Sequence, residues 1–139
     1  MKVIVLDTNI IFSILLDRGS KIREKFFEKD VRYIAPNFVF VELFKHKEKL
    51  LKFSRLSEAE LLELLHRILH RITFVDESTI ATANRHKALE LCQSVDESDT
   101  PFVALALELQ AELWSGDKKL VSGLRKQGFS KFYEPSSSK

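Results

Sequence analysis

The chain of 139 residues is the size of one compact domain, in which roughly two thirds of the unfolded surface can be buried. Its 45% hydrophobic and 30% charged residues are typical of a globular protein and argue against a disordered, fibrous or membrane chain. Because 22 Lys and Arg face 20 Asp and Glu, the net charge is only +2, and a surface for a polyanion requires local clustering of basic residues.

Cysteine content and the N-terminal segment bear on the compartment. Cys92 is the single cysteine, so an intramolecular disulfide is impossible and a reducing compartment fits. The apolar N-terminus is interrupted by Asp7 and Asn9, which argues against a signal peptide, and no stretch is long and apolar enough to span a bilayer. We therefore expect a cytoplasmic protein without a membrane contact.

The first elements alternate between strand and helix. Residues 2–6 are almost entirely apolar, as in a strand buried on both faces of a parallel sheet, and they end at Asp7. Isoleucines at helical spacing follow. A second strand is predicted at residues 31–35, and the proline and asparagine after it open a helix that contains Glu42.

The middle of the chain continues this alternation. Ser57 and Glu60 have the spacing of a capping box, and the leucines beyond them predict an amphipathic helix to about Leu69. Residues 72–75 are a candidate third strand, and residues 79–93 have a helical pattern.

The last third contains a helix with almost no polar face, at residues 101–110, which we expect to be deeply buried. A strand at residues 112–115 follows, and Asp117 can cap a helix that Gly128 ends. Residues 129–133 are predicted as a final strand.

Strands alternating with helices indicate an α/β fold, a three-layer sandwich with a central, mainly parallel β-sheet flanked by helices. We expect a single domain over residues 1–134 and a flexible C-terminal tail over residues 135–139.

Acidic residues recur where this fold places ligands, at the carboxyl ends of its strands. Asp7 and Asp117 each follow a predicted strand, Asp99 precedes a helix, and Glu42 lies in a flanking helix. Carboxylates gathered at one edge repel each other, and their hard oxygens suit Mg²⁺ or Mn²⁺. A bound cation of this kind could orient a phosphodiester and activate water.

A structural explanation exists for each acid. Asp is a favoured N-cap, and Asp7, Asp99 and Asp117 all stand near helix starts, although Thr100 is the better cap candidate beside Pro101. For Glu42, among apolar neighbours, the alternative is a nearby Lys or Arg partner.

Two basic runs flank these acids. Lys45, Lys49 and Lys52 are predicted to follow Glu42 along one helix, which would offer a phosphate track beside the acids. Lys118 and Lys119 follow Asp117. Solvated helix faces are the simpler interpretation of both runs.

The ordered motifs resemble the PIN domain over nearly the whole chain. They are Asp7-Thr8-Asn9 after a strand, Glu42 in the helix after the second strand, Asp99 before an Ala- and Leu-rich helix, and Ser115-Gly116-Asp117. The stretch from Asp99 to Asp117 is particularly similar to prokaryotic members, including toxin-type, VapC-like ribonucleases.

The resemblance implies a Mg²⁺- or Mn²⁺-dependent endoribonuclease whose metal-binding and catalytic acids are Asp7, Glu42, Asp99 and Asp117, with Asn9 and Ser115 as polar helpers. Asp96, three residues before Asp99, is an additional acid that could replace it, bind a second metal or cap the turn. An RNA substrate, an antitoxin partner and a homodimer are further implications.

Two other functions compete with the nuclease. One is a non-catalytic PIN-like adaptor that binds RNA or a protein partner. The other is a phosphohydrolase of the haloacid dehalogenase kind, which also begins with a strand ending in Asp. Such enzymes need a second Asp two residues further on, where this chain has Asn9.

Overall fold

The computed structural model describes residues 2–16, 20–28 and 30–135. Its centre is a sheet of four parallel strands in the order β3-β2-β1-β4. The strands are β1 (Lys2–Leu6), β2 (Val31–Pro36), β3 (Ile72–Val75) and β4 (Glu112–Trp114). The predicted α/β class and parallel sheet are therefore confirmed.

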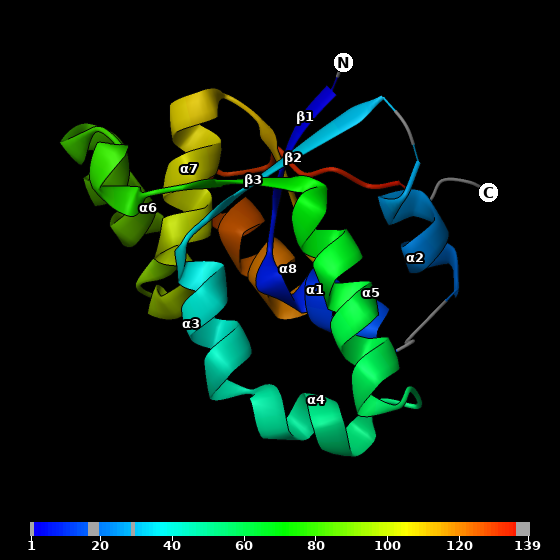
Figure 1. The fold of residues 1–139 in the computed structure, drawn as a ribbon. Helices are drawn as coiled ribbons and strands as arrows, with labels where there is room; N and C mark the ends of the chain where they lie inside the picture. Colours follow the sequence, from blue (N-terminus) through cyan, green and yellow to red (C-terminus); the bar gives the residue numbers. More distant parts are fainter. Residues whose placement is uncertain (1, 17–19, 29, 136–139) are drawn as a thin grey trace.

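Helices cover both faces of this sheet, which makes three layers. Figure 1 shows α6 and α7 on one side of the strands and α1, α2 and α5 on the other. The α-helices are α1 (Thr8–Leu15), α2 (Ser20–Phe26), α3 (Phe38–Lys45), α4 (Lys47–Phe53), α5 (Glu58–His70), α6 (Thr82–Cys92), α7 (Thr100–Leu109) and α8 (Lys118–Lys126). Short 3-10 turns, η1 (Glu77–Thr79) and η2 (Glu97–Asp99), precede α6 and α7.

The core lies between the sheet and its helices. Ile4, Val5 and Leu6 of β1 are fully buried, as expected for the apolar run of a central parallel strand. The predicted burial of α7 is also confirmed, because Phe102–Ala106 are all buried and the helix packs on β1 and β2. None of the described helices is both long and apolar enough to cross a bilayer.

Two boundary predictions are confirmed, one by hydrogen bonds and one by backbone conformation. Ser57 and Glu60 form the complete capping box of α5, with Ser57 Oγ accepting from the Glu60 amide at 3.1 Å and Glu60 Oε1 accepting from the Ser57 amide at 2.9 Å. Gly128 follows α8 with φ of 100°, a left-handed conformation that suits glycine.

The C-terminal segment differs from the prediction of a fifth strand at 129–133. It forms only one parallel bridge to β4, between Leu113 and Phe132. The Leu113 amide donates to Lys131 O and its carbonyl accepts from the Tyr133 amide. Two hydrogen bonds around one residue hold the segment against the sheet edge without producing a regular strand. Of the predicted tail, only Pro135 lies among the described residues.

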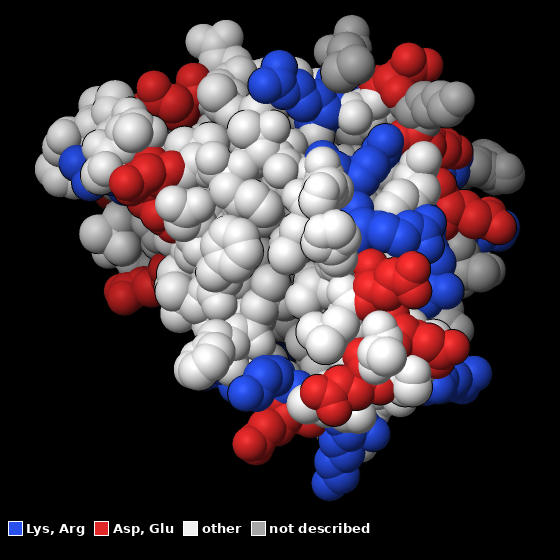
Figure 2. Space-filling model, in the orientation of Figure 1, with Lys and Arg blue, Asp and Glu red and all other residues white. Residues whose placement is uncertain are grey.

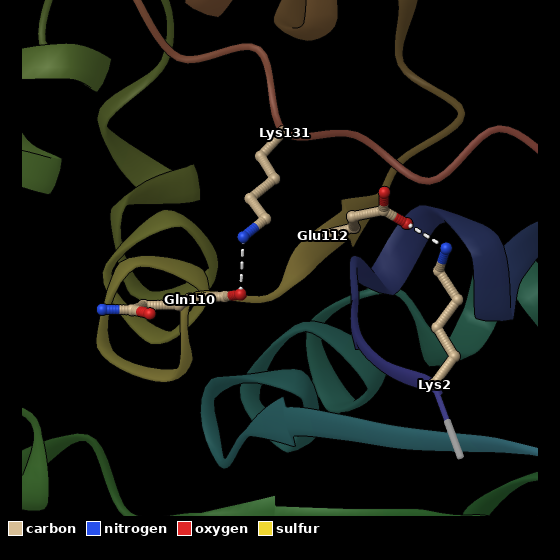
Figure 3. Close-up of polar contacts among 4 residues, drawn as sticks. All are labelled: Lys2, Gln110, Glu112 and Lys131. Atoms are coloured by element: carbon tan, nitrogen blue, oxygen red, sulfur yellow. Dashed lines mark hydrogen bonds and ion pairs between the residues drawn. The ribbon is translucent and has the colours of Figure 1, made fainter.

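Two lysines brace this edge of the sheet (Figure 3). Lys2 Nζ, from β1, lies 3.0 Å from Glu112 Oε1 on β4, and Lys131 Nζ donates to Gln110 O at 2.7 Å. Gln110 ends α7 in a left-handed conformation with φ of 51°, so Lys131 satisfies the carbonyl of the residue where the chain turns into β4.

The basic segment after Glu42 is not one continuous helix, contrary to the prediction. α3 ends at Lys45, and His46, with φ of −105° and ψ of 14°, separates it from α4. Lys45 therefore lies on a different helix from Lys49 and Lys52, and the three do not form a single track along one helix.

Candidate active site

The ends of β1 and β4 bring the first and last predicted acids to one edge of the sheet. Leu6 is in register with Trp114, and the Asp7 amide donates to Trp114 O at 3.0 Å. Asp7 is thus fixed beside the loop that leads to Asp117. Its side chain is buried, with 4% exposure, which is unusual for a carboxylate.

Ser115 connects this pair through side-chain hydrogen bonds. Its Oγ donates to Asp7 Oδ2 at 2.8 Å and accepts from the Asp117 amide at 3.1 Å. Asn9 holds the same loop, because its Oδ1 accepts from the Gly116 amide at 3.0 Å and its Nδ2 lies 3.5 Å from Ser115 Oγ. The two residues named as helpers therefore contact the first acid and its loop directly.

Asp117 has the structural role that its position suggested. It is the N-cap of α8, and its Oδ1 accepts from the Lys119 and Leu120 amides at 3.0 and 3.2 Å. Its Oδ2 is not engaged in this cap. Capping and a place in the acidic site are therefore compatible, because one carboxylate oxygen serves the helix.

Glu42 reaches the same region from α3, on the other side of β1. The carboxylate is half-buried, and its Oε1 lies out of contact with solvent and has no hydrogen-bond partner among the described residues. Burial raises its pKa, while the Thr8 hydroxyl and the positive charges of His46 and Lys45 oppose the rise. The structural alternative, an ion pair between Glu42 and a Lys or Arg, is not found in the described part of the chain.

Asp99 and Asp96 differ sharply in their surroundings. Asp96 is exposed, and its Oδ1 accepts from the Ser98 amide and hydroxyl at 3.0 and 2.7 Å, so it caps η2. Asp99 is 9% exposed and occupies the N-cap position of α7, yet its side chain makes no capping bond. Thr100, expected as the cap, is instead the first residue of α7, and its hydroxyl donates to Glu97 O.

Electrostatics link the acids that the fold brings together. Burial raises the pKa of Asp7 to about 6, against the hydrogen bonds from Ser115 and the Asn9 amide. Burial, together with the negative charges of neighbouring carboxylates, raises the pKa of Asp99 to about 8. These neighbours are Asp7, Asp96, Glu42 and Asp117.

The donor set suits a divalent ion in its chemistry but is not gathered around one position. Among residues 2–16, 20–28 and 30–135, no group of three or more His, Cys, Asp or Glu side chains has a geometry that could hold a metal. The acids are near enough to shift one another's pKa. Metal binding would therefore require their side chains to turn toward a common point. Glu42 Oε1 is buried and forms no hydrogen bond among the described residues, although the Thr8 hydroxyl lies near enough to lower the pKa of Glu42.

The predicted basic residues fall into two places. Lys118, at the start of α8, lines a groove with Ser115, whereas Lys119 is exposed and is not among the described residues of that groove. Lys45 is near enough to Glu42 to lower its pKa, while Lys49 and Lys52 are exposed on α4. Lys52 Nζ lies 5.3 Å from the centre of the Phe53 ring.

Thr8 is a site residue to which the sequence assigned no role. It is the first residue of α1, is 2% exposed, and has a buried Oγ1 that lacks a hydrogen-bond partner among the described residues. A polar residue between two acid-site residues was the available signal for Thr8. His46 follows Glu42 by one helical turn in the sequence, a spacing that suggested a place near the acids, and in the fold it is half-buried against the Phe12 ring.

The fold and the acids at its strand ends define an α/β sandwich with a carboxylate-rich edge. Comparison with protein families identifies the class, because the PIN domain model matches residues 5–133. The chain belongs to the PIN-domain family. No curated protein matches the sequence significantly.

Solved structures share this fold at low sequence identity. VapBC2 from Rickettsia felis, bound to a DNA fragment from their promoter, matches with a TM-score of 0.64 and 17% identity, covering 84% of this chain and 89% of that one. VapBC-1 from nontypeable Haemophilus influenzae matches at 0.63 and 17%, covering 89% and 93%. A toxin–antitoxin complex from Klebsiella pneumoniae matches at 0.59 and 14%, covering 86% and 90%.

Proposed function

We propose that this chain is a divalent-metal-dependent endoribonuclease, with Asp7, Glu42, Asp99 and Asp117 as the acids that hold Mg²⁺ or Mn²⁺. The observation that carries the proposal is the burial of Asp7 and Asp99, with raised pKa values, near two further carboxylates. Buried like charges destabilise a fold, so their retention at the strand ends favours a functional role. Membership of the PIN-domain family supports the same reaction class.

The chain's own residues have distinct tasks in this proposal. Ser115 and Asn9 hold Asp7 and the loop before Asp117, so the two acids keep a fixed separation. Asp99, at the end of η2, and Glu42, on α3, supply the remaining oxygens. A bound divalent ion would position a phosphodiester oxygen and lower the pKa of an attacking water, which needs no protein nucleophile.

Cleavage of RNA by purified protein tests this proposal. Asp99→Asn should abolish Mn²⁺-dependent cleavage while the circular dichroism spectrum is retained. Asp96→Asn is the matched control, because Asp96 is close in sequence but exposed and engaged in capping η2, and this variant should cleave at the wild-type rate. Wild-type protein that cleaves no structured or unstructured RNA with either metal would contradict the proposal.

A non-catalytic adaptor is the second candidate function, favoured by the absence of a ready-made metal cluster among the described residues. The two functions differ in metal binding. Calorimetric titration with Mn²⁺ should give a saturable signal that Asp7→Asn removes. No measurable binding by the wild-type protein would favour the adaptor.

We further propose an antitoxin protein as a partner, because the similar structures include VapBC and toxin–antitoxin complexes. An exposed apolar surface on α3 is available for it. Phe40, Val41 and Phe44 are 45%, 55% and 77% exposed, and Figure 2 shows uncharged side chains over α3 and β3. Burial of such a surface is favourable in association.

A homodimer, also proposed, would use the same kind of surface. Sedimentation equilibrium of the protein alone, and after coexpression with the product of the adjacent gene, separates the two assemblies. Phe44→Ser should weaken whichever association uses this surface, whereas the exposed Leu109→Ser, on α7, should not.

A further inference from the structure

A groove of about 670 Å³ runs along α8 and includes Ser115, the residue that donates a hydrogen bond to Asp7. Gly116, the next residue, also lines it. Further lining residues are Lys118, Ser122, Arg125 and Lys126 of α8, and Glu134 of the C-terminal segment. The groove therefore lies next to the acidic site, with Ser115 in common.

The helix itself explains why the basic side chains line one wall. Positions 118, 122, 125 and 126 share one face of an α-helix, since residues three and four apart are neighbours. Leu120 and Leu124 occupy the opposite, buried face and fix the rotation of α8 against the core. Lys118 and Arg125 therefore stand about 10 Å apart along the helix, from its rise of 1.5 Å per residue.

Arg125 is the cation of this wall that contacts both an aromatic ring and a carboxylate. Its guanidinium carbon lies 5.3 Å from the centre of the buried Phe132 ring, and its Nη2 lies 2.8 Å from Glu134 Oε2. A planar guanidinium held between a ring and one carboxylate keeps other N–H donors for an oxyanion. A phosphate bound in the groove would compete with the Glu134 carboxylate for Arg125.

A neighbouring cavity of about 840 Å³ is less suited to a polyanion. It shares Ser115 and Glu134 with the α8 groove, but its described charged residues are two lysines, Lys21 and Lys25, against three acids, Glu24, Glu28 and Glu134. The α8 groove has three cations against Glu134 alone. The excess of positive charge therefore makes the α8 groove the better of the two cavities for a polyanion.

We propose that the α8 groove binds the phosphate backbone of single-stranded RNA and leads it to the acids at Asp7 and Asp117. Arg125 and Lys126 are phosphate-binding residues, and Glu134 weakens binding by competing for Arg125. A volume of about 670 Å³, within the roughly 300–1,000 Å³ of small-ligand pockets, is enough for a short stretch of one strand. This inference rests on the proposed function for its substrate class and adds the path of the strand.

The test is the affinity for a short fluorescein-labelled oligouridylate, measured by fluorescence anisotropy in EDTA so that no cleavage occurs. Arg125→Gln should weaken binding roughly threefold and reduce the slope of log K against log salt by about 0.7, as for one lost contact to single-stranded phosphate. Glu134→Gln should strengthen binding, because it frees Arg125 and removes a repelling charge. Lys126→Gln should resemble Arg125→Gln.

Both Arg125→Gln and Glu134→Gln break the same ion pair, so a purely structural pair predicts changes in the same direction for the two variants. If Arg125→Gln lowers the affinity for the oligouridylate and Glu134→Gln raises it, the groove proposal is supported. If both variants change the affinity in the same direction, or neither changes it, the proposal is overturned. Lys87→Gln, an exposed lysine of α6, is the control that should leave affinity unchanged. Melting curves verify folding, and Lys126→Gln tests the groove without touching the ion pair.

Separate outcomes identify failure of the groove and failure of the nuclease. Opposite-sign binding effects without any Mn²⁺-dependent cleavage would support the groove as an RNA site and reject the nuclease. Cleavage with an unchanged KM in Arg125→Gln and Lys126→Gln would support the nuclease and reject the groove. Polyglutamate that displaces the oligouridylate at equal charge concentration would also overturn the assignment, because it would indicate an acidic peptide as the occupant.

Discussion

The hydroxyl oxygen of Ser115 lies 2.8 Å from Asp7 Oδ2 and donates a hydrogen bond to this buried carboxylate. The bond joins residues 108 positions apart and holds the pKa of Asp7 below the value that burial alone would give. Because the same oxygen accepts from the Asp117 amide, Ser115 also fixes the loop that starts α8. The fold therefore uses one hydroxyl to set both the charge and the position of the proposed metal ligands.

Ser115→Ala should raise the pKa of Asp7 above about 6 and lower the free energy of unfolding by about 1–3 kcal/mol, the range for a lost hydrogen bond to a buried charged group. The affinity for Mn²⁺ should fall, because Asp7 then holds its proton more tightly. Urea unfolding and calorimetric titration measure the two effects. Ser115→Thr, which keeps the hydroxyl, should restore both. The exposed Ser130→Ala is the control, and an unchanged Mn²⁺ affinity in Ser115→Ala would contradict the role of Ser115.

The raised pKa of Asp99 makes stability fall as the pH rises. Its ordinary value is 3.8 and its value in the fold is about 8, so the native state binds more protons than the unfolded state between these limits. Stability then decreases with pH across that window, and the destabilisation is complete above about 8. Without divalent ions, Asp99→Asn should have a higher Tm than wild type at pH 8 and nearly the same Tm at pH 4.

The informative quantity is the difference in stability between Asp99→Asn and the wild type, because the contributions of groups that titrate equally in both proteins cancel. At pH 8 the gain should be at least about 1.4 kcal/mol, the equivalent of one pKa unit. Asp96→Asn, which removes one contributor to the Asp99 pKa, should give a smaller gain of the same sign. A wild-type Tm that lies above that of Asp99→Asn at pH 8 would show that Asp99 is stabilising when charged.

Much of the site could be predicted because strands place it. Asp7 and Ser115 each follow an apolar run, and parallel neighbours bring the carboxyl ends of such strands to one edge. The preference for Asp99 over Asp96 was not available from local sequence. It depends on burial by α7 and on carboxylates from three other segments, which only the folded chain brings together.

The features of the fold that the sequence did not predict depend on tertiary contacts. The break at His46 lies in a run with no Gly or Pro, so no local signal marks it, whereas in the fold His46 packs edge-on against Phe12 of α1. The segment 129–133 has strand-like residues, but it meets the sheet at Leu113 alone. The secondary-structure propensity of each segment indicates what it favours, but its contacts with the rest of the fold determine the structure that it forms.

Metal binding should release a proton at neutral pH. At pH 7 Asp99 carries its proton, because its pKa is about 8, and a ligating carboxylate must lose it. Calorimetric titration with Mn²⁺ in two buffers of different ionisation enthalpy should therefore give different apparent enthalpies. The difference should shrink in Asp99→Asn if that variant still binds. Equal enthalpies in both buffers for the wild type would exclude a protonated ligand.

The position of Glu42 depends on a residue that the sequence did not associate with it. Asn37, at the N-cap position of α3, makes no side-chain capping bond; instead Glu77 Oε2 accepts from the Phe38 amide at 2.6 Å, across 39 positions of the chain. A carboxylate at a helix N-terminus also interacts favourably with the helix dipole. Glu77 thereby anchors the start of the helix that carries Glu42.

Glu77→Ala should lower the free energy of unfolding by about 0.5–2 kcal/mol, the cost of a lost N-cap, and should weaken Mn²⁺ binding because α3 is less firmly held. Hydrogen exchange should accelerate at the first amides of α3 and remain unchanged in α5 and α7. Glu63→Ala, exposed on α5, is the matched control. If exchange in α3 stays at the wild-type rate while global stability falls, Glu77 stabilises the protein without positioning Glu42, and the loss of Mn²⁺ affinity should then be absent as well.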